Sequence, residues 1–511
     1  MNSLDTLRRA AKTLRKAYND GDPAAFERLA VRPPRSDPGK LTHADFLHVI
    51  ARENNFASWP ALKLAVEISG MDRARKQQRL KIALYHGHNS AVDRLLTDTP
   101  DLARGLLELE IALYDLPAVK AALRKDPGLA VTPIGPRTPI LHLAFSKHFQ
   151  AHPEKSDAMM AIADLLVQHG ADVNDGFPFE PGSDHLLSAL YGALGHANNM
   201  RLAAWLLEQG ANPNDNESLY HATELGHRDG LRLLLRHGAD PTGTNALLRA
   251  LDFNDHAAVD LLLKAGADPN EGVSPHPSGE APMVASALHQ AARRMCDARM
   301  ADQLLEAGAD PDLLYDGMTA YALALAFGNL DVAQAIRGAG GSIEIPEDLQ
   351  PLISIARGGN GRLSADPAGL PRECRYMLHN LIHLPNTFSH IKRLVAGGLA
   401  FDEADDMGMT PLHLAGWEGL PEVMGFFLDM KPDLNHINGY GGTLLSTIIH
   451  GSENAPSAAS RDHVACARLA LQHGVSLPRR AIELAGEDSM AEFLADWGET
   501  HPAQLADHGV A

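Results

Sequence analysis

The 511-residue chain has little cysteine, few aromatic side chains and a shortage of positive charge. Its three cysteines, Cys296, Cys374 and Cys466, are far apart and odd in number. They therefore form no readable disulfide framework or CxxC metal site, which indicates a reducing compartment. Aromatic residues make up only 5% of the chain, which favours small helices rich in alanine and leucine over a large aromatic-lined cavity.

Lys and Arg number 45 against 64 Asp and Glu, so the formal net charge is −19. This field repels phosphate backbones and attracts basic protein surfaces. The sequence has no apolar run of membrane-spanning length, and its N-terminal stretch MNSLDTLRRAAKTLRKAYND has no apolar signal-peptide core. We therefore expect a cytoplasmic protein that binds neither nucleic acid nor membrane, and whose partner has a basic surface.

A chain of this length requires several domains or a repeat array. One short phrase recurs after pairs of leucines, as HGADVN (169–174), QGANPN (209–214), HGADPT (237–242), AGADPN (265–270) and AGADPD (307–312). The glycine is suited to the left-handed conformation that ends a helix. The following Asp or Asn, often before proline, favours an extended turn. The phrase therefore predicts a helix end followed by a turn.

A second phrase begins the next unit and is clearest in GMTPLHLAGWEG, residues 408–419. Its relatives include PILHLA (139–144), SLYHAT (218–223) and SALHQA (286–291). Together the two phrases resemble the ankyrin repeat. The resemblance implies an all-α α-solenoid of helix–turn–helix repeats with short β-turn fingers, about ten units long. It also implies binding of other proteins through the concave face and the fingers.

The resemblance assigns structural roles to the residues of the second phrase. Thr410 would cap the first helix of its repeat, with Pro411 in the first turn. His413 would hydrogen-bond the local backbone and stiffen the turn. In the variant SLYH, Ser218 would be the cap and His221 the turn histidine.

The spacing of the repeats suggests three parts of the chain. Residues 1–75 include IARENNFASWPALK (50–63), which resembles a helical module that precedes ankyrin arrays in bacterial proteins. Residues 76–342 would form the main repeat block. Residues 343–511 would hold degenerate and C-terminal repeats with capping helices. Irregular glycine spacing indicates insertions at 175–187, 271–285 and 452–462.

The run from Asn212 to Gly230 has the highest density of carboxylates and imidazoles. It contains no HExxH or similar ligand spacing, so we expect no metal, cofactor or catalytic site there. Its acidic finger should face solvent and offer side chains to a partner, as should the aromatics of the insertion 175–187. Trp417 could join them at the surface or pack at the turn between helices. The candidate partner-binding residues are Phe177, Phe179, Asp215, Asn216, Glu217 and Trp417.

These observations favour a monomeric, non-enzymatic protein–protein interaction scaffold. Two alternatives stay open at this point. The chain could be a dedicated inhibitor or immunity-type binder. It could also be an effector with a catalytic segment in residues 1–75 or 343–400, where the repeat pattern is weakest.

Overall fold

The computed structural model describes residues 3–33, 41, 43–272, 285–363, 369–455, 458–485 and 488–506. The chain divides into two compact units, Met1–Pro282 and Met283–Ala511, each described by itself below. This boundary lies within the predicted 76–342 block and within the second predicted insertion, most of which is outside the described residues. In the described part of the chain, helices dominate and the strands form three two-stranded sheets, which confirms the all-α prediction.

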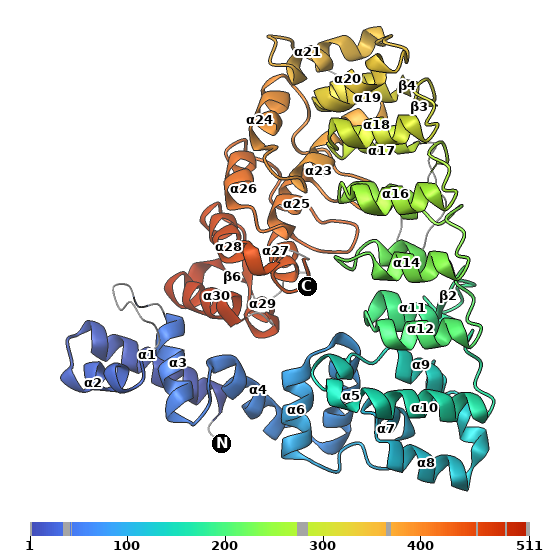
Figure 1. Ribbon diagram of the computed structural model, residues 1–511. Helices are drawn as coiled ribbons and strands as arrows, with labels where there is room; N and C mark the ends of the chain where they lie inside the picture. Colours follow the sequence, from blue (N-terminus) through green and yellow to red (C-terminus); the bar gives the residue numbers. More distant parts are fainter. Residues whose placement is uncertain are drawn as a thin grey trace. The chain divides into compact units, whose positions relative to one another are not determined.

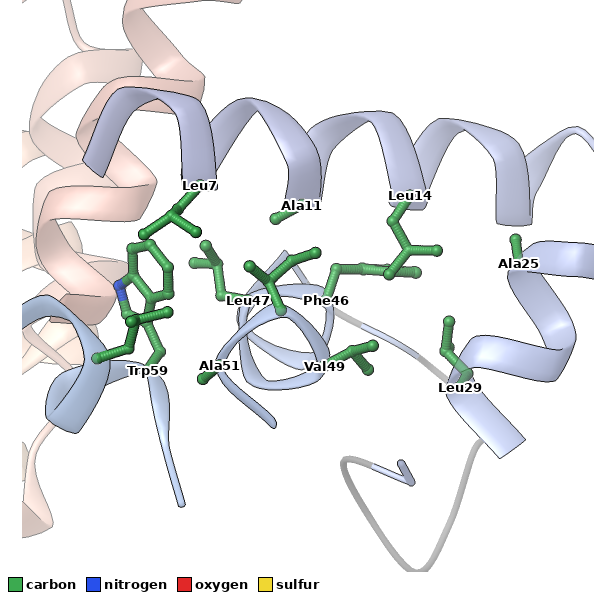
Figure 2. Close-up of a cluster of buried hydrophobic side chains, with 12 residues drawn as sticks. Leu7, Ala11, Leu14, Ala25, Leu29, Phe46, Leu47, Val49, Ala51 and Trp59 are labelled. Carbon is green, nitrogen blue, oxygen red and sulfur yellow. The ribbon is translucent and has the colours of Figure 1, made fainter. Parts of the chain in front are cut away.

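The first unit (called unit 1) opens with four helices, α1 (Leu4–Asn19), α2 (Pro23–Val31), α3 (His43–Glu53) and α4 (Trp59–Ser69). Leu7, Ala11 and Leu14 form one stripe of α1 and pack on Phe46 and Leu47 of α3 (Figure 2). Trp59, the aromatic residue of the SWP phrase, lies beside Leu7 at one end of this core. The amphipathic spacing of the N-terminal segment thus forms a small helical core.

Unit 1 continues as helix pairs (Figure 1). From the second pair onward, the first helix of each pair contacts the first helix of the next, and the second helices of the second and third pairs, and those of the last three pairs, contact in the same way. The pairs are α5 (Arg73–His86) with α6 (Asn89–Asp98), α7 (Leu107–Ala112) with α8 (Leu116–Lys125), α9 (Pro139–Ala144) with α10 (Ser156–Gln168), α11 (Ala189–Tyr191) with α12 (Met200–Glu208), α13 (Ser218–Ala222) with α14 (Asp229–Arg236), and α15 (Ala246–Asp252) with α16 (His256–Lys264).

The second unit (called unit 2) contains α17 (Ala287–Arg293), α18 (Ala298–Glu306), α19 (Ala320–Phe327), α20 (Leu330–Gly338), α21 (Gln350–Ala356), α22 (Arg372–Arg375), α23 (Met377–Ile382), α24 (Phe388–Ala396), α25 (Pro411–Trp417), α26 (Pro421–Leu428), α27 (Leu444–Asn454), α28 (His463–Gln472), α29 (Arg479–Leu484) and α30 (Asp488–Thr500). Within the weak segment 343–400, α21 packs on α19 and α24, and α23 packs on α25. The helix stacking therefore continues through this segment. No helix in the described residues is both long and apolar enough to span a membrane.

The three small sheets occupy loops between helices. Strands β1 (Gly176–Pro178) and β2 (Leu186–Ser188) pair antiparallel, with Phe177 opposite Leu187. The predicted insertion 175–187 is therefore a hairpin. In unit 2, β3 (Leu314–Tyr315) pairs antiparallel with β4 (Met318–Thr319), and β5 (Leu477–Pro478) pairs parallel with β6 (Leu505–Ala506).

The recurring glycine ends a helix as expected, because Gly170, Gly210, Gly238, Gly266 and Gly308 all have φ between 86° and 100°. The residue two positions later then closes the turn. Asp172 Oδ1 accepts a hydrogen bond of 2.9 Å from the backbone N–H of Asn174, and Asn212, Asp240, Asp268 and Asp310 repeat this contact.

Successive turns are also connected by side chains. Asn174 Oδ1 accepts a 2.7 Å hydrogen bond from the Asn212 backbone N–H, and Asn214 Oδ1 accepts one of the same length from that of Asp240. In unit 2, Asp312 accepts one of 2.6 Å from Ser342. In these three phrases the last residue therefore links one turn to the next.

Replacing Asn214 by alanine should remove one such link and lower the free energy of unfolding of unit 1 by about 1 kcal/mol, the net value of one hydrogen bond. Urea unfolding of the full chain would measure the change. Asn435→Ala is the matched control, because Asn435 follows an equivalent turn without a side-chain bond to a neighbouring turn in the described residues. Equal losses in the two variants would show that the link contributes nothing.

Candidate functional site

Two repeats in unit 2 show the ordinary form of the TPLH turn. Thr410 caps α25, since its Oγ1 accepts from the His413 backbone N–H at 3.3 Å and lies 2.8 Å from His413 Nδ1. Pro411 is buried as the first residue of the helix. His289 shows the longer reach of this histidine, because its Nε2 lies 3.1 Å from the carbonyl oxygen of Met318 in the next repeat.

The variant turn at 215–221 is capped by a different residue from the one expected. Ser218 does not cap α13; its hydroxyl donates to Asp215 Oδ2 at 2.7 Å. Asp215 replaces it, because Oδ1 accepts from the backbone N–H groups of Glu217 and Ser218 at 3.1 and 2.7 Å. A carboxylate can accept several hydrogen bonds at once, so it takes over the role of the threonine hydroxyl. Ser188, at the end of β2, donates a further bond to Asp215.

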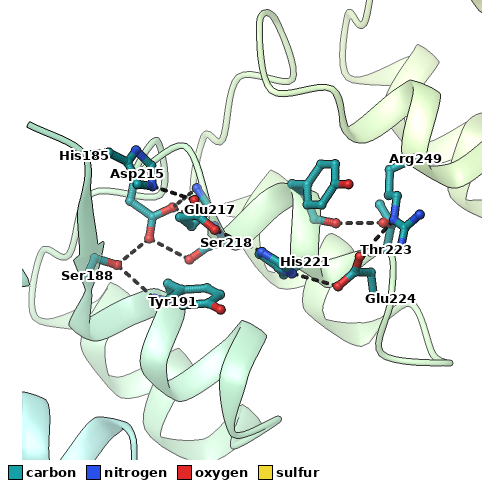
Figure 3. A network of polar contacts seen from close by, with 11 residues as sticks. His185, Ser188, Tyr191, Asp215, Glu217, Ser218, His221, Thr223, Glu224 and Arg249 are labelled. Atoms are coloured by element: carbon teal, nitrogen blue, oxygen red, sulfur yellow. Dashed lines mark hydrogen bonds and ion pairs between the residues drawn. The ribbon is translucent and has the colours of Figure 1, made fainter. Parts of the chain in front are cut away.

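The prediction that Glu217 faces solvent is wrong, because only 3% of this residue is exposed. Its carboxylate lies between two imidazoles, with Oε1 2.5 Å from His185 Nε2 and Oε2 2.9 Å from His221 Nε2 (Figure 3). The hairpin that carries His185 covers the finger and removes Glu217 from water. A buried carboxylate requires such partners.

The expected backbone role of His221 is also wrong. Its two ring nitrogens face carboxylates, and Nδ1 lies 2.7 Å from Glu224 Oε2. Glu224 in turn receives Arg249 of α15 at 2.7 and 2.8 Å. His185, Glu217, His221, Glu224 and Arg249 thus form a charge network that crosses three successive repeats (Figure 3).

Electrostatics fix the protonation of this charge network. Burial lowers the pKa of His221, but hydrogen bonds with Glu217 and Glu224 outweigh it and raise the pKa to about 9. Burial raises the pKa of Glu224, whereas His221 and Arg249 hold it below its ordinary value. His221 is therefore a cation at neutral pH that donates from both nitrogens. Such a group has no free lone pair to bind a metal or to accept a proton, and its contacts connect neighbouring repeats.

The described residues contain no group of three or more His, Cys, Asp or Glu side chains arranged to hold a metal ion. Beside the charge network lies a groove of about 290 Å³ between the β1–β2 hairpin and the finger 211–216. Asp184 and Leu186 line one wall, and Asn214, Asp215 and Asn216 line the other. The half-buried Asp215 and the exposed Asn216 therefore border a concave surface.

The hairpin buries one of its two phenylalanines and exposes the other. Phe177, expected in an exposed loop, is only 8% exposed, and its ring packs 5.2 Å from that of Phe145. Phe179 is 46% exposed, as is Leu186 at 47%. Phe179 lies beyond β1, which ends at Pro178, so its exposure is not set by the alternation that places Phe177 and Leu187 on the buried face. Leu186 was not a candidate from sequence, although the doublet Leu186–Leu187 must place one leucine on each face.

Trp417 is half-buried at the end of α25. Its ring lies 5.3 Å from that of His450, and its carbonyl oxygen lies 2.8 Å from His463 Nε2. This places it at the turn between helices, the second of the two positions considered for it. Trp417 therefore has a packing role in unit 2.

Unit 2 has its own exposed apolar side chains at adjacent turns. Met407, Ile437 and Tyr440 are all exposed, and Tyr440 reaches 73%. The Gly439 N–H donates to the Met407 carbonyl oxygen at 2.7 Å, so the two turns touch. These residues were missed from sequence; their signal is apolar residues between glycines, in MGM and INGYGG.

A comparison with known protein families agrees with the repeats observed in unit 1. Residues 186–272 match the family described as ankyrin repeats, in three copies. Among solved structures, an ankyrin repeat domain from Acinetobacter baumannii AYE is similar, with 22% sequence identity over 38% of this chain and 99% of that chain, and a TM-score of 0.30. No curated protein matches the sequence.

Proposed function

We propose that this chain, whose residues 186–272 match ankyrin repeats, acts as a non-enzymatic scaffold that binds a partner protein through the β1–β2 hairpin and the neighbouring fingers of unit 1. The observation that carries the proposal is the exposure of Phe179 and Leu186 on the hairpin, where Leu186 lines the groove. Apolar side chains grouped on a surface with a polar rim are typical of protein interfaces.

The rim of the groove indicates the chemistry of the partner. Asp184 and Asp215 contribute carboxylates, and Asn212, Asn214 and Asn216 contribute amides. With a net charge of −19 for the chain, this rim favours a basic surface on the partner. Glu217 is not proposed as a contact residue, because its carboxylate is bonded to His185 and His221. Phe177 is not proposed as a contact residue either, because its buried ring packs on that of Phe145.

The test is the substitution Phe179→Ser in the full chain. The partner would first be isolated by affinity capture with the unmodified protein and identified by mass spectrometry. Phe179→Ser should then weaken binding at least tenfold in a titration, since aromatic hot-spot residues contribute about 2 kcal/mol or more. Identification of the partner would also distinguish a general scaffold from a dedicated inhibitor.

The control is Leu330→Ser, which removes an exposed apolar side chain of similar accessibility from α20, away from any finger hairpin. It should leave binding unchanged. Equal affinity of the Phe179→Ser variant and the unmodified protein would refute the assignment of the hairpin as the binding surface.

A further inference from the structure

A cavity of about 420 Å³ in unit 1 lies outside the groove described above. It is bordered by the first helices α5, α7 and α9 and by the turn 134–137, and it opens to the surface. Leu84, Leu109 and Phe145 give it apolar walls, whereas Lys81, Glu108 and Arg137 bring charge to it. The cavity therefore combines an apolar interior with a few placed ionic groups, which is the usual composition of a binding pocket.

Arg137 is held in this cavity by aromatic rings. Its guanidinium carbon lies 4.6 Å from the ring centre of Tyr85, 5.0 Å from that of Phe145 and 4.4 Å from that of Phe177. Its Nε atom is buried without a hydrogen-bond partner in the described residues. Cation–π contacts fix the orientation of a guanidinium but do not neutralise its charge.

The cations around the cavity outnumber the anions. Lys81 is paired with Glu108 at 2.9 Å, whereas no carboxylate in the described chain forms an ion pair with Arg137 or with the half-buried Lys147. Burial lowers the pKa of Arg137. Burial, and then Lys147, lower the pKa of His196 to about 4. This is an unneutralised positive site in a protein that carries a large net negative charge.

We propose that this cavity binds the carboxylate of an acidic side chain in a peptide segment of the partner protein, an inference that rests on the proposed function as a protein-binding scaffold. The planar guanidinium offers its N–H groups to two carboxylate oxygens at once. The apolar walls hold the hydrocarbon part of the same side chain. Glu108 on the same wall repels a doubly charged phosphate more strongly than a single carboxylate.

The cavity and the hairpin are connected through Phe177. One face of this ring contacts Arg137, while Phe179, two residues later on the hairpin, stands in solvent. A partner can therefore place a basic surface against the acidic groove and an acidic residue into the cavity. This combination specifies a segment with charges of both signs.

The experiment uses an array of ten-residue peptides in matched triplets whose central residue is glutamate, glutamine or phosphoserine. The full chain should retain the glutamate member of its preferred triplets at least tenfold more strongly than the glutamine member. Arg137→Gln should abolish this difference. Arg201→Gln, which removes an exposed cation from α12, should preserve it. Arg137→Lys, which keeps the positive charge but loses the bidentate geometry of the guanidinium, should give an intermediate preference for glutamate over glutamine.

Equal retention of glutamate and glutamine peptides would overturn the proposal, as would a preference for phosphoserine or a glutamate preference that survives Arg137→Gln. If Arg137→Gln does not fold, as judged by circular dichroism, the binding site is tested instead by hydrogen exchange of the unmodified protein. The best glutamate peptide should protect residues 134–146 from exchange, and absence of protection would refute the site. Phe179→Ser should keep the glutamate preference, so failure of this site and failure of the hairpin assignment are distinguishable.

Discussion

Replacing Glu373 by alanine is expected to lower the free energy of unfolding of unit 2 by about 3–5 kcal/mol, because it leaves a buried guanidinium without its partner. Arg293 of α17 lies 3.3 Å from Glu373 Oε2, and both side chains are less than a tenth exposed, at 7% and 3%. The hydroxyl of Tyr315 donates to Glu373 Oε1 at 2.8 Å. One carboxylate in α22 therefore satisfies groups from two earlier elements.

Thermal or urea unfolding of the full chain, followed by circular dichroism, would measure this loss. Arg372→Ala is the control, since Arg372 also faces Glu373, at 3.6 Å, but is largely solvated, and it should cost under about 1 kcal/mol. The double variant Arg293→Met with Glu373→Leu should recover much of the stability, because an apolar pair needs no charge compensation. A loss below about 1 kcal/mol in Glu373→Ala would show that water reaches Arg293.

The second large effect is a pH dependence that comes from His221. Its pKa is raised in the folded protein to about 9, against about 6.5 for an ordinary histidine. A raised pKa means that the folded state holds the proton more tightly. The contribution to stability is therefore fully present below pH 6.5 and is lost as the pH rises through 9. Its size follows from the shift and is about 3 kcal/mol.

Unfolding of the unmodified protein and of His221→Gln should be compared between pH 6 and pH 10. The difference between the two should be largest at pH 6 and should fall steeply above pH 8. Tyr191, whose ring lies 5.0 Å away, does not interfere, because burial and Glu217 raise its pKa above this range. His227→Gln is the control, since that ring meets the amide of Asn198. A difference independent of pH would mean that His221 is not charged in the fold.

The sequence predicted the parts of this protein that depend on local chemistry. The positive φ of Gly170 and its equivalents follows from one residue and its neighbours, and so does the cap at Thr410. The stacking of helix pairs follows from the leucine stripes. These features require no knowledge of which distant segments meet.

The exposure of the candidate site residues was harder to predict, because it depends on contacts between repeats. Glu217 is covered by His185, which lies 32 positions earlier, and Phe177 is covered by Arg137 and Phe145. Both contacts are made by the inserted hairpin. The irregular spacing of the repeat glycines located this insertion but did not indicate which residues pair across its two strands. In the same way, the pairing of Arg293 with Glu373 spans 80 positions.

The hairpin at 176–188 has one further consequence, for the evolution of recognition. Its base is fixed by pairing of Phe177 with Leu187 and by the rings beneath, whereas the side chains of Phe179 and Leu186 are about half exposed. Mutations at the tip can thus accumulate and change specificity while the repeats remain folded. A lineage carrying this scaffold can therefore follow a changing partner through a few codons of the hairpin.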